Sequence, residues 1–467
     1  MPGPMTTTTP TSRSPVARHF QLAERDTTVR REVLGGVATF LTMSYIVFVN
    51  PAILSAAGLP FDAVAVATAL AAAGFTAVMA LATNLPLALA SGLGINAVVA
   101  FDIVLGRKLD PSVGMACIVI EGVVAIVLVL LGLREAVVRA VPEALKLAIG
   151  VGIGLFIALV GLRDAGIVVN DPATGIGLGD LSAGPPLIAL GGIAVAFAMS
   201  AANIRGSILA GIFTATALGL IFGVLSGPDA LARWPTSHDF STIGEPFEGG
   251  AIKDALTWGL IPVIFALFMT DFFDTVGTAY AVTSAGGLLD ERGEIPKVRN
   301  LLLVDSAAAA GGGAMGVSSV TTYVESGAGV AEGARTGLAS LVTAGLFALT
   351  IFFVPLIAVV GQGVAVGKDT VLHPAVAPAL VMVGYLMIHL VRAIDWELPE
   401  SAVPAFLTIV GIPLTFSIAA GIGFGVFGYV IAMVARRRAA EVHPLMWALV
   451  PLFAAFFLSD WLAAHVF

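Results

Sequence analysis

The chain has 467 residues, of which 58% are hydrophobic and only 12% charged, and its formal net charge is −8. About a quarter of the residues of a soluble protein are charged, so this composition excludes that class and indicates a polytopic membrane protein. One cysteine, Cys117, excludes an intrachain disulfide, and the histidines show no metal-ligand spacing. We expect no metal, no cofactor and no ATP-driven step, since no phosphate-binding Gly-Lys-Ser/Thr loop is present. No basic patch suggests nucleic acid as a partner.

Residues 1–32 are polar and rich in Thr, Ser and Pro, which predicts a disordered cytoplasmic tail and not a signal peptide. Apolar stretches of about 17–25 residues predict spanning helices. Seven precede a polar loop, at 33–56, 60–83, 86–104, 112–133, 143–162, 186–203 and 206–226. Seven follow it, at 257–285, 299–316, 319–332, 336–360, 374–391, 401–418 and 420–435. The apolar segment 443–463 could span the membrane, lie on its surface or pack against the bundle.

Positive charge supports this count of fourteen spans. With the N-terminus inside and the spans alternating, seventeen of the 23 Lys and Arg residues fall on the inner side. Inner loops of membrane proteins carry such an excess. We therefore expect a multi-pass protein of the plasma (inner) membrane with a cytoplasmic N-terminus.

The two halves of the chain resemble each other. Ser-Gly-Leu-Gly at 91–94 matches Ser-Gly-Ala-Gly at 326–329, and Ala-Leu at 144–145 matches Ala-Leu at 379–380, both 235 positions apart. Seven is an odd number of spans, so the second half must insert inverted relative to the first. Inverted repeats of this kind are typical of secondary transporters.

Spans 3 and 10 carry residues that interrupt a helix. Span 3 has Pro86 and the Gly-containing run at 91–94, and span 10 has β-favouring residues at 320–323, with three glycines upstream of it at 311–313. Each predicts a short extended segment followed by a half-helix, and the two segments could pair as antiparallel strands inside the protein. The N–H groups at each half-helix start would then face a ligand.

Three carboxylates lie in apolar surroundings within predicted spans: Asp271 and Asp274 in span 8, and Glu325 in span 10. A charge at this depth costs at least a few kcal/mol, so such residues usually line a solute pathway. Glu325 could instead cap a helix, and Asp274 could pair with a neighbouring helix. Asp271 suits a proton relay and a structural role equally.

Other embedded polar residues have weaker claims. Gly94 and Asn96 occupy the position in span 3 that is pseudo-symmetric to the span 10 site, and an Asn offers a donor and an acceptor to a heterocycle. Capping is the alternative for Asn96. Thr278, one turn beyond Asp274, could face the pathway or bond back to its own helix. We interpret Glu121 and Asp305 as scaffold or relay residues.

Several of these segments resemble motifs of a known family. The runs 35–51, 92–97, 271–278 and 321–326 are similar to the span 1, 3, 8 and 10 motifs of azaguanine-resistance-type purine permeases, which transport guanine, hypoxanthine or adenine. These permeases belong to the nucleobase–cation symporter-2 family. The runs 404–408 and 443–446 are similar to the family's C-terminal part.

This resemblance implies an all-α fold with two inverted repeats of seven spans. It implies a core domain of spans 1–4 and 8–11 (33–135 and 257–360) and a gate domain of spans 5–7 and 12–14 (136–226 and 361–437). An extracellular loop, 227–256, joins the halves, and a tail, 438–467, follows. Family members import purine bases with protons and are often dimeric. The expected partners are therefore a purine base, a proton, the lipid bilayer and a second copy of the chain.

The resemblance also assigns roles to residues. It places substrate binding on Asp274 and Glu325, supported by Gly94 and Asn96. We expect further substrate contacts from Thr278 and from Val324 and Ser326 beside Glu325. We expect proton coupling by Glu325, Asp274 and Asp271, because a desolvated carboxyl can carry a proton.

Purine:proton symport is the leading hypothesis, because a carboxylate accepts the N–H groups of hypoxanthine or guanine with charge-assisted strength. Adenine fits less well, since its N1 is an acceptor. An anion exchanger or channel on a similar scaffold is the alternative, but two site carboxylates would repel an anion. An intramembrane enzyme is a third possibility. It is disfavoured because Asp271 and Asp274 lie on one helix, whereas paired catalytic carboxylates usually come from two converging elements.

Overall fold

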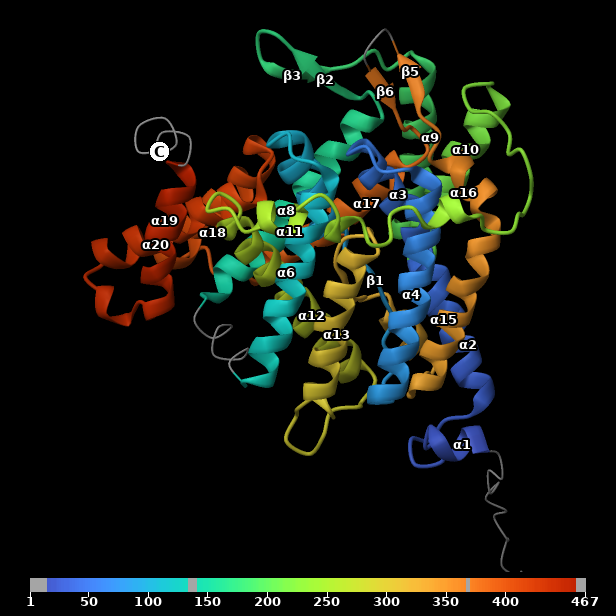
Figure 1. Ribbon diagram of the computed structural model, residues 1–467, viewed down its shortest axis with the longest axis horizontal. Helices are drawn as coiled ribbons and strands as arrows, with labels where there is room; N and C mark the ends of the chain where they lie inside the picture. The colour runs from blue at the N-terminus through green and yellow to red at the C-terminus, as the bar shows by residue number, and fades with distance from the viewer. Residues whose placement is uncertain (1–14, 133–140, 367–369, 459–467) are drawn as a thin grey trace, which may run out of the picture.

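The computed structural model describes residues 15–132, 141–366 and 370–458, which are mostly helical (Figure 1). The first half comprises α1 (Pro15–His19), α2 (Val29–Met43), α3 (Ile46–Ala56), α4 (Phe61–Thr83), β1 (Leu89–Ser91), α5 (Leu93–Ala97), the π-helix η1 (Val98–Gly106), α6 (Pro111–Leu130), α8 (Glu143–Asp164), β2 (Val168–Asp171), β3 (Gly175–Leu178), α9 (Gly184–Ala201) and α10 (Ser207–Ile221).

The outer loop and the second half comprise short 3₁₀ turns, η2 (Ser237–Phe240) and η3 (Glu245–Phe247), then α11 (Ala251–Ala255), α12 (Ile261–Ala285), α13 (Val298–Ala314), β4 (Val320–Thr322), α14 (Ser326–Ala331), α15 (Gly337–Thr350), η4 (Ile351–Phe353), α16 (Val354–Val360), β5 (Val364–Val366), β6 (Thr370–Leu372), α17 (Ala377–Met387), η5 (Ile388–Ala393), α18 (Pro399–Thr415), α19 (Ile418–Ala435), η6 (Ala439–Glu441) and α20 (Pro444–Phe457).

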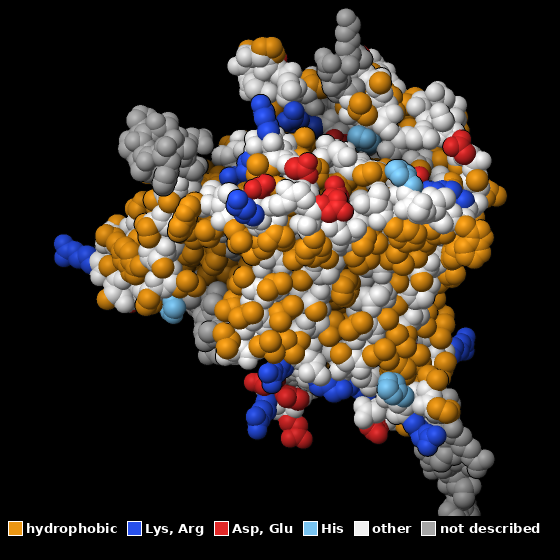
Figure 2. All heavy atoms as spheres, viewed as in Figure 1, with side chains coloured by type: hydrophobic (Ala, Val, Ile, Leu, Met, Phe, Trp, Pro, Cys, Tyr) orange, Lys and Arg blue, Asp and Glu red, His pale blue; other side chains and the backbone are white. Residues whose placement is uncertain are grey.

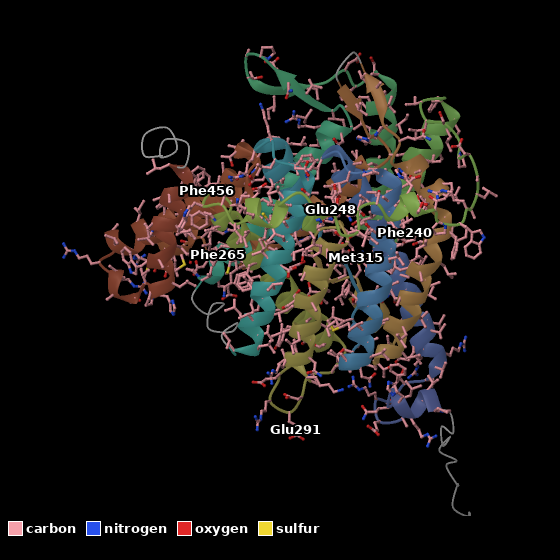
Figure 3. All side chains as sticks on the ribbon, viewed as in Figure 1. Phe240, Glu248, Phe265, Glu291, Met315 and Phe456 are labelled. Carbon is pink, nitrogen blue, oxygen red and sulfur yellow. The ribbon has the colours of Figure 1, made fainter. Side chains whose placement is uncertain are left out.

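Helices lie at the positions of the predicted spans. Within the described residues, eight are long and apolar enough to cross a membrane on their own, which makes the chain an integral multi-pass membrane protein. A wide apolar band crosses the face of the molecule seen in Figure 2, and charged side chains gather above and below it. Glu291, in the loop after α12, lies at the lower end near α1, whereas the β2–β3 and β5–β6 hairpins lie at the upper end (Figures 1 and 3).

Two expectations need refinement. Span 1 is divided at Ser44 and Tyr45 into α2 and α3, whereas the continuous apolar run predicted one helix. The C-terminal apolar segment packs against the bundle: α20 lies against α19 and buries Met446 and Phe453. Its predicted end, 459–463, lies outside the described residues.

The predicted disordered tail at 1–32 is wrong for its described part, residues 15–32. Phe20 and Leu22 are buried in a small apolar cluster with Leu338 and Leu341 of α15. The Glu32 carboxylate, fully buried in the first turn of α2, accepts N–H bonds at the start of α15, including one of 2.9 Å from Arg335. Composition suggested disorder, but two apolar side chains and one capping carboxylate are enough to fix this segment. Residues 1–14 lie outside the described part, as does the predicted boundary at 135/136.

The helices pack in two groups. In one, α2 packs against α14 and α15, α4 against α3, α13 and α15, and α6 against α12 and α13. In the other, α8 packs against α17 and α18, α9 against α10 and α17, and α18 against α19. Close approach depends on small residues: a Cβ on Gly122 of α6 would lie 2.3 Å from the Ala310 nitrogen of α13. The two groups meet where α12 packs against α19 and α8, and where α5 packs against α8.

The loop before α12 is fastened to the end of the molecule opposite α1. Arg233 donates to both oxygens of Asp239, at 2.5 and 2.6 Å, and to Asp62 at the start of α4. These bonds from Arg233, followed by the Thr236 N–H, hold the pKa of Asp239 well below its usual range. The loop thereby connects α4 to the turn between α15 and α16, where the Arg233 N–H reaches the Phe352 carbonyl at 2.9 Å.

Asp239→Asn should lower the free energy of unfolding by about 1–2 kcal/mol at pH 7, because it removes the charge that a partly exposed Arg233 binds. A depressed folded pKa stabilises the protein above the ordinary Asp value of about 4, and this stabilisation is lost as the pH falls through the folded value. The difference from wild type should therefore shrink toward pH 3 in thermal unfolding of the purified protein. Asp229→Asn, in the same loop and exposed, is the matched control. A pH-independent difference would contradict the assignment.

Candidate functional site

The two interrupted spans meet inside the protein. β1 and β4 pair antiparallel, with Ala90 opposite Thr321, and every residue of both strands is buried. The Gly92 N–H donates to the Ser319 carbonyl and the Tyr323 N–H to the Ala88 carbonyl, which extends the pairing at both ends. The expected antiparallel strands in spans 3 and 10 are thus present, and each leads directly into a short helix, α5 or α14.

Glycine brings α14 close to span 1. A Cβ on Gly329 would lie 2.3 Å from the Thr39 hydroxyl and 2.6 Å from the Gly35 carbonyl. Real Cβ atoms essentially never approach other atoms so closely, so only glycine fits. The close packing sets the first residues of α14, including Glu325, against the break between α2 and α3.

Glu325 lies at this contact. The residue is partly exposed, and its Oε1 accepts a hydrogen bond of 2.6 Å from the Tyr45 hydroxyl. Its carbonyl accepts a longer bond, 3.4 Å, from the Thr42 hydroxyl. The neighbouring Val324 is 59% exposed, so the turn that enters α14 borders an open space.

Asp274 borders open space from the other side. No residue of α12 between Ile261 and Phe273 is exposed, whereas Asp274, Gly277, Tyr280, Ala281 and Ser284 are. These exposed residues recur at helical spacing along the half of α12 nearest α1. A carboxylate facing lipid would be costly, so a stripe that starts at Asp274 indicates an aqueous path.

Asp271 is placed differently from Asp274. It is 1% exposed, and one of its oxygens accepts a 3.1 Å bond from the Ser319 hydroxyl just before β4. Asp305 of α13 is also fully buried and accepts bonds from Thr275 at 2.7 Å and Thr322 at 3.3 Å. These two carboxyl groups hold β4 against α12 and α13.

Asn96 belongs to a buried chain of hydrogen bonds. Its amide donates to Asn50 Oδ1 at 2.6 Å and accepts from the Ser91 hydroxyl at 2.9 Å. Asn50 in turn donates to the Thr68 hydroxyl at 2.8 Å. Asn96 has no exposed surface, so this structure gives it the role of joining α3, α4 and β1, and not the ligand contact that the sequence suggested.

Most of the remaining expected site residues are buried against other parts of the protein. Gly94 faces the other helix group, since a Cβ there would lie 2.9 Å from Ile153 of α8. The Ser326 hydroxyl is buried and accepts the Ala88 N–H at 3.0 Å. Thr278 is 8% exposed and lies beside the open stripe of α12. Among the expected site residues, Asp274 and Val324 are exposed and Glu325 is partly exposed.

Sequence reasoning missed three residues at the site. Tyr45 and Asn50 were part of a motif but carried no assignment, although a hydroxyl and an amide within an apolar span require partners. Lys146 of α8 was counted only among the positive charges on the inner side of the membrane. Its ammonium lies 4.7 Å from the centre of the ring of Phe273, the residue before Asp274. No sequence signal joined α8 to α12. No three His, Cys, Asp or Glu side chains within the described residues are grouped to hold a metal.

Comparison with known proteins identifies the family. Residues 30–424 match the model of the family described as the permease family, Xan_ur_permease. The chain belongs to this family. It is therefore a transporter and not an enzyme, and the motif resemblance in spans 1, 3, 8 and 10 is confirmed.

Curated relatives cover nearly the whole permease. A putative permease of Methanocaldococcus jannaschii is 40% identical over 94% of this chain and 97% of its own. The guanine/hypoxanthine permease PbuG of Bacillus subtilis is 38% identical over 94% and 98%, and the adenine permease AdeP of Escherichia coli is 36% identical over 96% and 97%.

Solved structures share the fold at low identity. The transmembrane domain of the cyanobacterial bicarbonate transporter BicA has a TM-score of 0.56 at 16% identity, over 87% of this chain and 96% of that one. The murine anion transporter Slc26a9 in its inward-facing state has a TM-score of 0.58 at 12% identity, over 87% and 68%. At such identities the likeness concerns the fold alone.

If Asn96 joins elements, its loss should destabilise the permease without any ligand. Asn96→Ala leaves the buried Asn50 Oδ1 without its donor, while the Ser91 hydroxyl can still donate to the Val317 carbonyl, so the loss should cost about 1–3 kcal/mol of unfolding free energy. Asn50→Ala should cost a similar amount, and the double variant should cost at least about 0.5 kcal/mol less than the two losses together. Thermal unfolding of the purine-free protein measures this, with Asn300→Ala on α13 as control. Additive losses would show that the two amides do not act together.

Proposed function

We propose that this permease imports purine nucleobases, hypoxanthine and guanine foremost and adenine as a further substrate, by proton symport. The open stripe of α12 that begins at Asp274, next to the carboxylate of Glu325, carries this proposal. Relatives at 36–38% identity are named guanine/hypoxanthine and adenine permeases, which supports the substrate class.

The site chemistry fits a neutral, flat, N–H-rich solute. Ionised carboxylates accept N–H groups and donate nothing, so Asp274 and Glu325 suit a base with several donors. Oxopurines place N1–H beside a carbonyl, and the N–H groups where α5 and α14 begin supply donors for that carbonyl. Adenine presents an acceptor at N1, so its binding requires a protonated carboxyl or a different orientation.

Proton coupling follows from two carboxylates in one cleft. Asp274 and Glu325 are close enough to influence each other, and two negative charges out of bulk water oppose one another. Taking up one proton relieves this repulsion. We propose that Glu325 and Asp274 carry the transported proton, and that Asp271, held by Ser319, acts as a relay or as support for β4.

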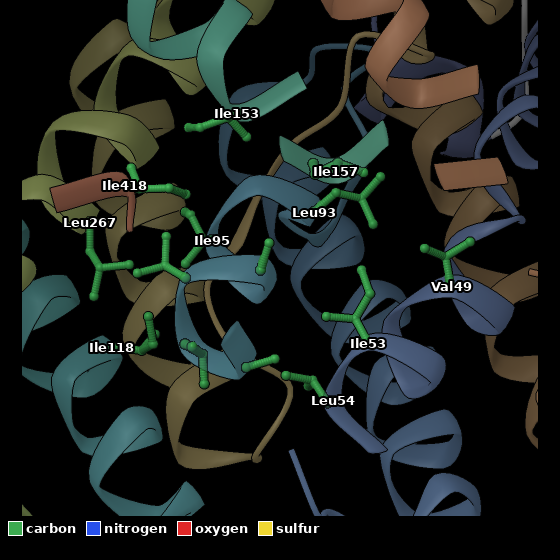
Figure 4. Packing of buried hydrophobic residues seen from close by; sticks show 14 of the residues in the cluster. Val49, Ile53, Leu54, Leu93, Ile95, Ile118, Ile153, Ile157, Leu267 and Ile418 are labelled. Carbon is green, nitrogen blue, oxygen red and sulfur yellow. The ribbon is translucent and has the colours of Figure 1, made fainter. Parts of the chain in front are cut away.

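The two packed helix groups correspond to a core domain (33–135 and 257–360) and a gate domain (136–226 and 361–437), which together form fourteen spans in two inverted repeats. Supporting this, a strand and a short helix follow the second predicted span of each half, as β1 and α5 after α4 and as β4 and α14 after α13. Leu93 and Ile95 of α5 face Ile153 of α8 and Ile418 of α19 across the interface (Figure 4). The 227–256 loop is extracellular and the N-terminus cytoplasmic, in the plasma membrane, and the permease works as a homodimer.

The outer part of the core–gate interface is packed shut. Phe156 of α8 contacts the rings of Phe101 and Phe416, with centroids 5.9 and 5.5 Å away. The Ser417 hydroxyl at the start of α19 donates to Asp102 of η1 at 2.6 Å. Together with the exposed stripe on the inner half of α12, these contacts support an inward-facing state, in which the purine leaves toward the cytoplasm.

Anion exchange is the alternative that the fold allows and the site does not favour. The solved structures of similar fold include a bicarbonate transporter, but at 12–16% identity they do not carry their substrates to this chain. Lys146 near Phe273 is a cation that the sequence analysis had not placed at the site. Two carboxylates beside it still make the cleft unfavourable for an anion.

Cells that express the permease should accumulate labelled hypoxanthine, and an uncoupler should abolish accumulation while removal of sodium should not. Glu325→Gln keeps the shape of the side chain but loses the charged acceptor and the proton site, so accumulation should fall to background. Glu248→Gln, on the exposed outer loop, is the control. If Glu325→Gln accumulates hypoxanthine as the wild type does, Glu325 has only the structural role of capping α14. Bicarbonate uptake without purine uptake would favour the anion reading.

Asp274→Asn should weaken purine binding more than Asp271→Asn does. Asp274 borders the cleft, and losing a charged acceptor there costs about 1.5–3 kcal/mol, which is roughly a tenfold to hundredfold loss of affinity. Asp271 is buried against Ser319, so its variant should lower the unfolding temperature first. Calorimetric binding of hypoxanthine to each purified variant, with its thermal unfolding, separates the two. Near-normal binding in Asp274→Asn together with lost binding in Asp271→Asn would reverse the roles.

A further inference from the structure

The break in span 1 places a tyrosine hydroxyl on the site carboxylate. α2 ends at Met43 and α3 begins at Ile46, so Tyr45 lies in the turn between them. Its side chain is 3% exposed, and its hydroxyl donates to Glu325 Oε1 at 2.6 Å across 280 positions of sequence. A phenylalanine would fill the same apolar space, so what the tyrosine adds at this position is the hydrogen bond to Glu325.

The same turn also contacts the backbone of Glu325. The Thr42 hydroxyl, one turn before Tyr45, lies 3.4 Å from the Glu325 carbonyl. Span 1 therefore touches both the main chain and the carboxylate of the residue where α14 begins. The Tyr45 bond is to Oε1, and Glu325 as a whole is partly exposed.

We propose that Tyr45 is the positioning residue of Glu325. Its hydroxyl holds one carboxylate oxygen, directs the other toward the cleft shared with Asp274, and stabilises the ionised form that accepts a purine N–H. This inference rests on the proposed function, because it assigns the group that sets the charge and direction of the substrate acceptor.

The other ionisable groups near Glu325 do not donate a hydrogen bond to its carboxylate in the described part of the chain. Tyr323, on the same segment, donates its hydroxyl to the Ser91 carbonyl instead. Asp274 on α12 and Asp305 of α13 are carboxyl groups, which when ionised accept hydrogen bonds and cannot donate to Glu325. Within the described part of the chain, Tyr45 provides the side-chain donor seen on the Glu325 carboxylate.

Tyr45→Phe should change the pH dependence of binding as well as its strength. Without the donor the carboxylate is less stable and keeps its proton to a higher pH, so binding that needs the ionised acceptor is lost earlier on acidification. We expect hypoxanthine to bind about tenfold more weakly at pH 7. The pH of half-maximal binding on the acid side should rise by about one unit.

The experiment is calorimetric titration of hypoxanthine into purified Tyr45→Phe between pH 5 and 8, with thermal unfolding of the purine-free protein. Tyr429→Phe, half-buried on α19, is the matched control and should behave as wild type. Tyr323→Phe removes a hydroxyl that binds the main chain, so it should change stability without moving the pH profile.

Unchanged affinity, or weaker binding with an unshifted pH profile, overturns the positioning role. If Tyr45→Phe does not fold, 3-fluorotyrosine at position 45 keeps the ring and strengthens the donor, so the half-maximal pH should fall; an unchanged or higher value overturns the proposal. If the wild-type protein itself does not bind hypoxanthine, the proposed function is contradicted. The wild-type titration therefore separates failure of the proposed function from failure of the positioning role of Tyr45.

Discussion

The structure depends on the backbone hydrogen bonds between β1 and β4. At bilayer depth no water satisfies an exposed N–H or carbonyl, so an interrupted helix is tolerated only if another segment completes it. Here two interrupted spans, distant in sequence, complete each other. Everything specific to the site follows from that pairing, because it stops two helices inside the protein and lets α5 and α14 start beside α2, α3 and α12.

Buried hydroxyls make the pairing compatible with nearby charge. Ser319 binds Asp271, while Thr275 and Thr322 bind Asp305, so both inner carboxyl groups hold β4 in place. Asp274, one turn beyond Asp271 on α12, instead meets open space. Carboxyl groups on neighbouring turns thus receive opposite environments, one structural and one accessible, because the β4 segment covers only one face of the helix.

A shared fold does not by itself determine which solute a transporter carries. Transporters of bicarbonate and other anions share the arrangement at 12–16% identity. In this permease Asp274 is exposed, Glu325 is partly exposed, and Tyr45 from the break in span 1 donates to the Glu325 carboxylate. Fold likeness therefore bounds the architecture, and the chemistry of a few residues selects the solute.

The sequence by itself determined the membrane class, the helix positions, the interrupted spans 3 and 10 and the family. These follow from local composition, because apolar length and glycine or proline placement act within one segment. Tertiary structure decided which polar residues face the cleft. Asn96 and Ser326 proved buried, Tyr45 reached Glu325 and residues 15–32 docked, since each outcome depends on partners up to about 300 positions away. A residue's type states what bonds it can make, but only packing decides whether a neighbour or a solute makes them.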